Sequence, residues 1–293
     1  MKVTKLTGCG TALITPFDIG LNVDFEVYRS LVKRQVEAGV HFLVPLGTTS
    51  ESPCLSEEEK MALLGITADE VNGRVPIIAG VGSNSTEHVI KNIHDYEKLG
   101  ADGYMVVTPY YNKPTQEGLY THFKDIAECT DKPIVMYNVP SRTGTNMLAE
   151  TTLRLAEIKN IIAVKEASSD YNQINEIIRK APEGFTVISG NDIETLPLCV
   201  SGATGVISVV SNVVPGDMAE LMNFILKGNY DEARKLHQKL TPMFNNCFIE
   251  SNPIPAKAAM HELGLIENVL RPPLYPATDK TKQIMKETLL ALN

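Results

Sequence analysis

Lys165 stands at the polar end of a short apolar run, Ile161–Lys165, which is typical of a buried strand. A lysine in such a place loses hydration when it is charged, and this loss lowers its pKa from about 10.4. A neutral amine is a nucleophile that can form a Schiff base with a carbonyl substrate. The alternative is a strand-end lysine whose ammonium group reaches water. The choice between a nucleophilic and a solvated Lys165 therefore depends on the other polar residues predicted to lie near it.

Two further polar residues follow a neighbouring apolar run. Tyr137 ends that run, and its phenol can carry protons to and from a carbinolamine if it is hydrogen bonded into a relay. Arg142 follows in a loop bounded by proline and glycine, and a guanidinium group can bind a carboxylate through two hydrogen bonds. The alternatives are a tyrosine that only packs and a solvated loop arginine.

Hydroxyl groups and phenols follow two more of the runs. Thr48 and Thr49 lie in Gly47–Glu51, where they either hold a phenol or a substrate carboxylate or only form the turn before a helix. Tyr110 and Tyr111 either take part in the site or serve as packing or interface residues. Together with Lys165 and Arg142, these side chains make a proton-transfer set with one anion-binding cation.

The elements that must position these residues repeat one theme: a short apolar run, a polar loop and a helical stretch. The runs are continuous rather than alternating, as expected of parallel strands buried on both faces. Eight β/α units within about 225 residues predict a TIM (β/α)8 barrel, whose active site lies at the C-terminal ends of the strands. The predicted strands are Thr11–Thr15, Phe42–Leu46, Pro76–Gly80, Gly103–Thr108, Pro133–Tyr137, Ile161–Lys165, Thr186–Ser189 and Gly205–Val210.

Helix signals fall between these runs and after the last one. Ser56 with Glu59 has the spacing of a capping box, and Gly39 is a stop signal. After Gly228 only helices are predicted, so we expect a catalytic barrel over 1–228 and a C-terminal helical domain over 229–293 that packs on it. The predicted helices include Phe25–Ala38, a segment from Ser85 to near Gly100, Asp192–Val200, Tyr230–Leu240, Pro255–Leu263 and Lys280–Leu292.

The composition excludes several classes of protein. The formal charge is −8 and the basic residues are dispersed, which argues against nucleic acid or an anionic membrane as partner. No apolar stretch approaches the roughly 20 residues of a membrane span, and no signal peptide opens the sequence. Five scattered cysteines without a CxxC pair predict neither a zinc site nor disulfides, and therefore a cytoplasmic protein. Gly80-Val-Gly82 lacks the third glycine of a dinucleotide-binding motif.

Several of these segments together resemble the dihydrodipicolinate synthase family, within the pyruvate-dependent class I lyase superfamily that also contains N-acetylneuraminate lyase. The resemblance covers nearly the whole chain, and only the combination of motifs is specific. The motifs are Gly47-Thr-Thr-Ser-Glu51, Pro109-Tyr-Tyr-Asn-Lys-Pro114, Tyr137-Asn-Val-Pro-Ser-Arg-Thr-Gly144, Val164-Lys-Glu-Ala167, Ser189-Gly-Asn-Asp192 and Asn252-Pro-Ile-Pro-Ala-Lys257.

The resemblance implies a reaction: condensation of pyruvate with L-aspartate 4-semialdehyde to 4-hydroxy-tetrahydrodipicolinate, in lysine and diaminopimelate biosynthesis. Lys165 would form the Schiff base with pyruvate, so that neither a cofactor nor a metal is needed. Tyr111 would enter the site of a neighbouring subunit, which implies a dimer at least and usually a homotetramer.

The resemblance also assigns roles to the other site residues. Tyr137, Thr48 and Tyr111 would form a proton relay, and Arg142 would bind the carboxylate of the semialdehyde. The pyruvate pocket would be lined by Thr49 and by the backbone at Gly190 and Ile207.

Three other functions remain open. One is a sister lyase acting on N-acetylneuraminate or another 2-keto-3-deoxy acid, although sialic acid lyases lack an arginine at the position of Arg142. Another is a non-catalytic paralogue that binds pyruvate or an amino acid. The third is a phosphate-binding barrel, but Ser211–Pro215 lacks the glycine-rich loop that would hold the phosphate.

The chain departs from the family's pattern at two places. Ser50 stands where the family's loop more commonly has glycine, so we expect the loop to bend differently, because serine does not adopt positive φ as readily. His88 stands where members inhibited by lysine use a glutamate in an effector site at the subunit interface. Asn84 and Tyr110 are retained there, and Pro53 is a neighbouring position.

From His88 we predict weak or absent inhibition by L-lysine, because a histidine does not replace the acidic partner of the effector's amine. The measurement is the initial rate of the condensation at rising L-lysine concentration. Inhibition at sub-millimolar L-lysine would contradict the prediction.

Overall fold

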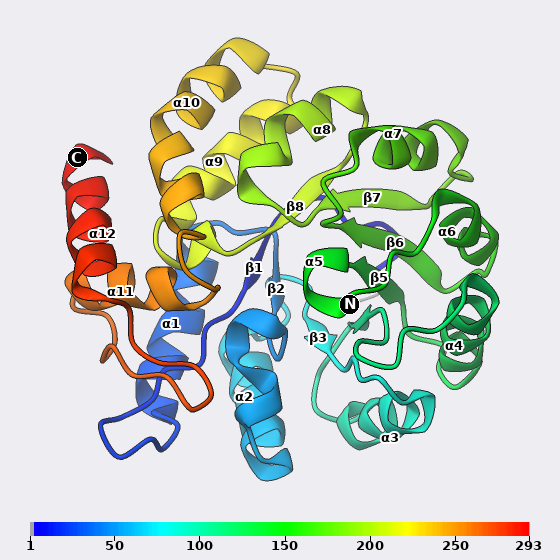
Figure 1. The fold of residues 1–293 in the computed structure, drawn as a ribbon, viewed down its shortest axis with the longest axis horizontal. Coiled ribbons are helices and arrows are strands. Elements are labelled where there is room, and N and C mark those ends of the chain that lie inside the picture. Colours follow the sequence, from blue (N-terminus) through cyan, green and yellow to red (C-terminus); the bar gives the residue numbers. More distant parts are fainter. Residues whose placement is uncertain (1–2, 293) are drawn as a thin grey trace. The chain divides into compact units, whose positions relative to one another are not determined.

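The computed structural model describes residues 3–292, and its eight strands belong to one sheet in which every assigned strand pair is parallel (Figure 1). Helices alternate with the strands along the chain, and additional helices follow the eighth repeat. The predicted TIM (β/α)8 barrel with a C-terminal helical extension is therefore confirmed. The strands are β1 Gly8–Ala12, β2 Phe42–Val44, β3 Ile78–Gly80, β4 Gly103–Val107, β5 Ile134–Asn138, β6 Ile161–Glu166, β7 Thr186–Ser189 and β8 Gly205–Ser208.

The described chain divides into two compact units. Unit 1 contains residues 3–7 and 76–207, and unit 2 contains residues 8–75 and 208–292. The predicted boundary at residue 228 is not tested by this division and stays a prediction.

Unit 1 carries β3 to β7 and all but the last residue of β8, hydrogen bonded in sequence order. These strands are buried along almost their whole length, as the continuous apolar runs predicted. Figure 1 shows α3, α4, α6 and α7 along the outer side of these strands. The helices of unit 1 are α3 Thr86–Tyr96, α4 Gln116–Glu128, α5 Pro140–Thr143, α6 Ala149–Ala156, α7 Tyr171–Lys180 and α8 Thr195–Ser201.

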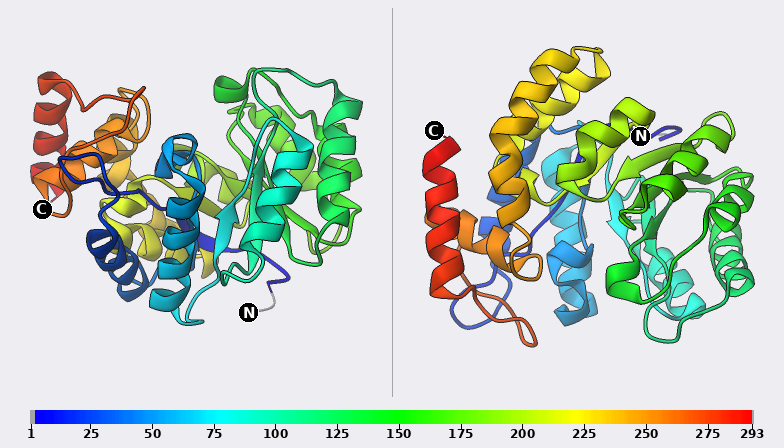
Figure 2. Two further views of the ribbon diagram at one scale, coloured as in Figure 1. Left: turned by 90° about the horizontal axis from the view of Figure 1, so that it is seen from below. Right: turned by 45° about the horizontal axis from the view of Figure 1, so that its top comes forward.

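Unit 2 carries β1, β2 and six helices. Its C-terminal helices pack on one another: α12 contacts α10 and α11, and α10 contacts α9 (Figure 2). The predicted capping box is present, because Ser56 Oγ accepts from Glu59 N and Glu59 Oε2 accepts from Ser56 N. The helices are α1 Phe25–Glu37, α2 Glu57–Val71, α9 Pro215–Leu226, α10 Tyr230–Asn246, α11 Ile254–Glu262 and α12 Asp279–Leu292.

The first strand lies three residues earlier than predicted. It begins with Gly8 and includes Gly10, although glycine is unfavourable in strands. A Cβ atom on Gly10 would lie 2.0 Å from the Phe42 ring, so the strand needs glycine there for close packing. Ile14 lies beyond the end of the strand, and its N–H donates to the side chain of Asn212.

The last strand and one helix also differ in length from the prediction. β8 ends at Ser208, whose Oγ accepts from Ser211 N, and a 3-10 turn follows. Helix α10 runs past Pro242 to Asn246, because Met243 and Phe244 on its last turn are buried. None of the helices among residues 3–292 combines the length and apolar character needed to cross a membrane.

Candidate active site

Lys165 and Tyr137 lie side by side at the C-terminal ends of β6 and β5. The two residues are paired in the strand register, so both side chains leave the sheet in the same direction. Lys165 Nζ lies 4.2 Å from the centroid of the Tyr137 ring. Both residues are buried. The structure therefore brings together the predicted nucleophile and the predicted proton carrier.

The Lys165 amine is tuned by its surroundings. Burial lowers the pKa of Lys165 to about 7; the carboxylate of Asp192 opposes this shift, and the positive charge of Arg142 adds to it. With this lowered pKa, more of the amine is neutral near pH 7 than at an ordinary lysine pKa. The structure thus supports the nucleophile over the solvated strand-end lysine. The sequence analysis singled out no role for Asp192.

A buried polar network lies on the other side of the same two strand ends. Asn138 and Glu166, each one residue beyond the reactive pair, are fully buried and joined by a 2.8 Å hydrogen bond from Asn138 Nδ2 to Glu166 Oε1. Asn138 also donates to Asn146 Oδ1 at 2.8 Å and accepts from Met147 N at 3.0 Å. These bonds join the ends of β5 and β6. They also tie the end of the segment 139–147, which carries Arg142, back to its start.

Glu166 is buried like a catalytic carboxylate, but its side chain points to the opposite face of the sheet from that of Lys165. Burial raises the pKa of its carboxyl group, whereas hydrogen bonds from Ser168 and Asn138 oppose the shift. Consecutive strand residues point to opposite faces. A polar residue directly after each reactive residue is therefore the sequence signal from which this supporting network could have been found.

Arg142 lies in the short helix α5, which ends at Thr143 and is capped by Gly144. Gly144 has φ of 70°, and its N–H donates to Pro140 O at 2.9 Å. The side chain of Arg142 is exposed, and its charge acts on the pKa of Lys165. A substrate anion held by Arg142 would therefore lie within the electrostatic reach of the amine.

The backbone positions predicted to line the pyruvate pocket are both in unit 1. A Cβ atom on Gly190 would lie 2.6 Å from Ala167 Cβ, so only glycine fits beside that strand end. Gly190 N donates to Glu166 O, and any contact of the Gly190 backbone with a substrate has to come from its carbonyl group. Ile207 is fully buried in β8.

Tyr111 is not part of the buried cluster. Its side chain is 89% exposed, and its φ is 72°. The neighbouring Asn112 donates from Nδ2 to Asn84 O at 3.0 Å, which brings two of the predicted effector positions, Asn84 and the Tyr110 loop, together. His88 is exposed on the first turn of α3.

Thr48 and Thr49 lie in unit 2, in a 3-10 turn that follows β2. Thr48 is exposed, whereas Thr49 is buried and its Oγ1 accepts a 3.0 Å hydrogen bond from Asn252 Nδ2. A hydroxyl that accepts from an amide keeps its own proton for another acceptor, such as a carboxylate. Asn252 was noted only as part of a motif, and its contact with Thr49 spans 203 positions in the sequence. Pro53 is exposed in the next 3-10 turn.

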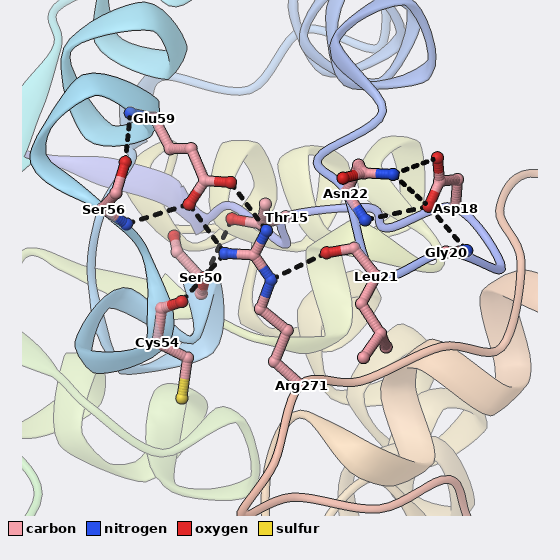
Figure 3. A network of polar contacts seen from close by, with 10 residues as sticks. All are labelled: Thr15, Asp18, Gly20, Leu21, Asn22, Ser50, Cys54, Ser56, Glu59 and Arg271. Carbon is pink, nitrogen blue, oxygen red and sulfur yellow. Dashed lines mark hydrogen bonds and ion pairs between the residues drawn. The ribbon is translucent and has the colours of Figure 1, made fainter.

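Ser50 fits this turn without strain. Its Oγ donates to Leu13 O at 2.6 Å, and its carbonyl accepts from Thr15 Oγ1 at 2.8 Å, a bond drawn in Figure 3. Within Gly47–Glu51 the positive φ, 55°, belongs to the next residue, Glu51. Serine therefore stands at a position that does not need the conformational freedom of glycine.

Comparison with known proteins gives one consistent result. A sequence model described as the dihydrodipicolinate synthetase family matches residues 5–292. A protein of Thermotoga sp. (strain RQ2) named 4-hydroxy-tetrahydrodipicolinate synthase is 50% identical over 286 residues, which cover 96% of this chain and 97% of that protein. A protein of the same name from Phocaeicola vulgatus is 47% identical over 290 residues, covering 99% of this chain and 98% of its own.

Solved structures agree with these matches. The crystal structure of dihydrodipicolinate synthase from Thermotoga maritima superimposes with a TM-score of 0.96 at 49% identity, covering 98% of each chain. A structure described as a monomeric dihydrodipicolinate synthase variant gives a TM-score of 0.96 at 48% identity, covering 98% of this chain and 97% of that one.

The balance of charges at Lys165 predicts a pH effect. Replacing Asp192 by asparagine removes a carboxylate that stabilises the ammonium form, so the pKa of Lys165 should fall below about 7 and the amine should become reactive at lower pH. The measurement is the rate of borohydride-trapped adduct formation with pyruvate from about pH 5.5 to about pH 9, which covers roughly two units on either side of the pKa of about 7. Glu150→Gln, an exposed carboxylate of the same unit, is the control. An unchanged midpoint in Asp192→Asn would contradict the argument.

Proposed function

The chain belongs to the dihydrodipicolinate synthetase family, and from this premise we propose that it condenses pyruvate with L-aspartate 4-semialdehyde to 4-hydroxy-tetrahydrodipicolinate. The single observation in the structure that carries the proposal is the buried Lys165 amine, with its pKa lowered to about 7, in contact with the Tyr137 ring. The activity predicted from the sequence agrees with the names of the matched relatives, which are synthases rather than sialic acid lyases or binding proteins.

The first half of the proposed reaction makes an enamine on the protein. Neutral Lys165 attacks the ketone carbon of pyruvate, and the resulting carbinolamine loses its hydroxyl as water to give a cationic imine. Tyr137 carries the protons that these steps release and require. The positive imine then acidifies the methyl group of the bound pyruvate, and loss of one methyl proton gives the enamine.

The second half joins the substrates and releases the product. The enamine carbon attacks the aldehyde carbon of the semialdehyde, whose carboxylate is held by Arg142. The aldehyde oxygen takes up a proton and becomes the hydroxyl group of the product. The substrate amine then attacks the imine carbon, closes the ring and displaces Lys165, so that one water is released overall and no separate cofactor or metal is required.

The proposed proton relay also includes Thr48 and Tyr111. In a (β/α)8 barrel, reactive residues meet at the C-terminal ends of the strands, and Thr48 follows β2 at such an end. Tyr111 is almost fully exposed in its own chain, which fits a residue that completes the site of a neighbouring subunit. We therefore propose a homotetramer built from dimers, and we propose that the enzyme acts in the cytoplasm, in lysine and diaminopimelate biosynthesis.

The test of the proposed function is product formation from pyruvate and L-aspartate 4-semialdehyde, coupled to the reductase that consumes the product. Turnover is expected in the wild-type protein and loss of at least about 10³-fold in Lys165→Ala, because the nucleophile is missing. Borohydride with pyruvate should trap an adduct on the wild-type protein and none on the variant. Lys159→Ala, which removes an exposed lysine of the same unit, is the matched control and should behave as wild type.

Different failures of this test point to different functions. An adduct without turnover would favour a sister lyase, to be checked with N-acetylneuraminate and other 2-keto-3-deoxy acids. Absence of any adduct would favour a non-catalytic binding protein.

Arg142→Ala should impair the semialdehyde step while leaving imine formation in place. We expect KM for the semialdehyde to rise by at least about tenfold, because a charge-assisted bidentate contact is lost. The pyruvate adduct should be measured at pH 9, since loss of the guanidinium group also raises the pKa of Lys165. Arg179→Ala, at an exposed arginine of α7, is the control. An unchanged KM for the semialdehyde would exclude the role given to Arg142.

A further inference from the structure

A second buried lysine, Lys257, lies in unit 2 and takes no part in the proposed chemistry. It ends the motif that begins at Asn252, and its side chain is completely buried. Its ammonium nitrogen lies 2.5 Å from Glu51 Oε1, donates to Val269 O at 2.9 Å and lies 4.3 Å from the centroid of the Phe17 ring. The ammonium group is therefore paired with one carboxylate, one carbonyl oxygen and one ring face.

Glu51 connects this lysine to the turn that carries Thr48 and Thr49. Its N–H donates to Thr48 O at 3.0 Å and closes the turn. Its carboxylate is fully buried and is held from two later segments, with Oε1 beside Lys257 and Oε2 accepting from Arg271 N at 3.0 Å. A glutamate rarely adopts the left-handed conformation found here, with φ of 55°, so its contacts must hold it in place.

Lys257 and Glu51 both bond to the backbone of the segment Val269–Arg271, and the side chain of Arg271 anchors that segment (Figure 3). Its guanidinium nitrogens Nη1 and Nη2 lie 2.6 Å from the two carboxylate oxygens of Glu59. The same side chain donates to Leu21 O at 2.9 Å and to Cys54 O at 2.8 Å. Arg271 therefore holds two places: Cys54, three residues after Glu51, and Glu59 in the first turn of α2.

We propose that the Glu51–Lys257 ion pair is a positioning device for the pyruvate half of the reaction, a role that rests on the proposed function. The pair contacts neither substrate in this mechanism, but it fixes the residue that directly follows the threonine turn. Asn252, from the same motif as Lys257, holds the hydroxyl of Thr49. The motif Asn252–Lys257 thus controls both the place of the turn and the direction of its hydroxyl proton.

A purely structural role explains the pair less well. Replacing a buried ion pair by apolar groups of similar size commonly leaves stability unchanged or raises it. Stability alone therefore gives no reason for two charges at this position. Geometry does, because a displacement of about 1 Å in a reacting group can cost roughly 100-fold in rate.

The test uses Lys257→Met in the full-length protein, with kinetics measured separately for each substrate. We expect kcat/KM for pyruvate to fall by at least about 30-fold, because the turn shifts when its ionic anchor is lost. KM for the semialdehyde should stay within about twofold, because its proposed ligand Arg142 lies on a different segment. Lys235→Met is the matched control, because it removes a lysine from an exposed ion pair with Glu232 in the same unit and should leave all constants unchanged.

Two further variants separate positioning from stability. Glu51→Gln combined with Lys257→Met removes both charges, and it should recover the melting temperature of the wild-type protein but not its kcat/KM for pyruvate. Glu51→Asp keeps the charge, shortens the side chain and should lower kcat/KM for pyruvate by about tenfold with little change in melting temperature.

The outcomes are distinct. Wild-type kcat/KM for pyruvate in Lys257→Met, in the double variant or in Glu51→Asp would overturn the inference, as would equal losses for both substrates in proportion to lost stability. If Lys257→Met does not fold, the double variant and Glu51→Asp decide by the same criteria. Absence of turnover in both the wild-type protein and Lys235→Met would overturn the proposed function instead.

Discussion

Removal of the Lys165 amine from water is the constraint on which the proposed site depends. The strand that carries it is buried throughout, so the ammonium form loses hydration and the pKa of the amine falls. Asp192 opposes the resulting fall in pKa and Arg142 adds to it. Two contributions therefore lower the pKa of the amine and one raises it, and a change in any of them alters the pH range in which the amine can attack a carbonyl.

Tyr137, Lys165 and the turn Thr48–Ser50 are each followed directly by a buried polar residue with a polar partner. Asn138 and Glu166 follow Tyr137 and Lys165, and Glu51 follows the turn Thr48–Ser50. These polar groups are bonded to other parts of the same unit, which makes their burial tolerable. Satisfied buried networks hold their members in one arrangement, and that is what a reaction dependent on proton transfer requires.

Arg142 and Tyr111, two of the exposed residues among the predicted site positions, contrast with the buried pair. Arg142 lies on a short helix beyond β5, and Tyr111 lies on the loop beyond β4. Exposure fits their proposed roles, because one has to meet an incoming substrate and the other a neighbouring subunit. Rigid strand ends thus carry the covalent chemistry, whereas loops carry recognition.

The sequence by itself determined the barrel, the capping box of α2 and the position of Lys165 at a strand end, because apolar runs and caps are local patterns. It did not reveal that β1 begins at Gly8, where packing against distant rings overrides the poor strand propensity of glycine. Nor did it reveal that burial of Met243 and Phe244 carries α10 past Pro242. The contacts of Lys257 with Glu51 and of Asn252 with Thr49 join residues about 200 positions apart, and only the tertiary fold decides which distant residues meet.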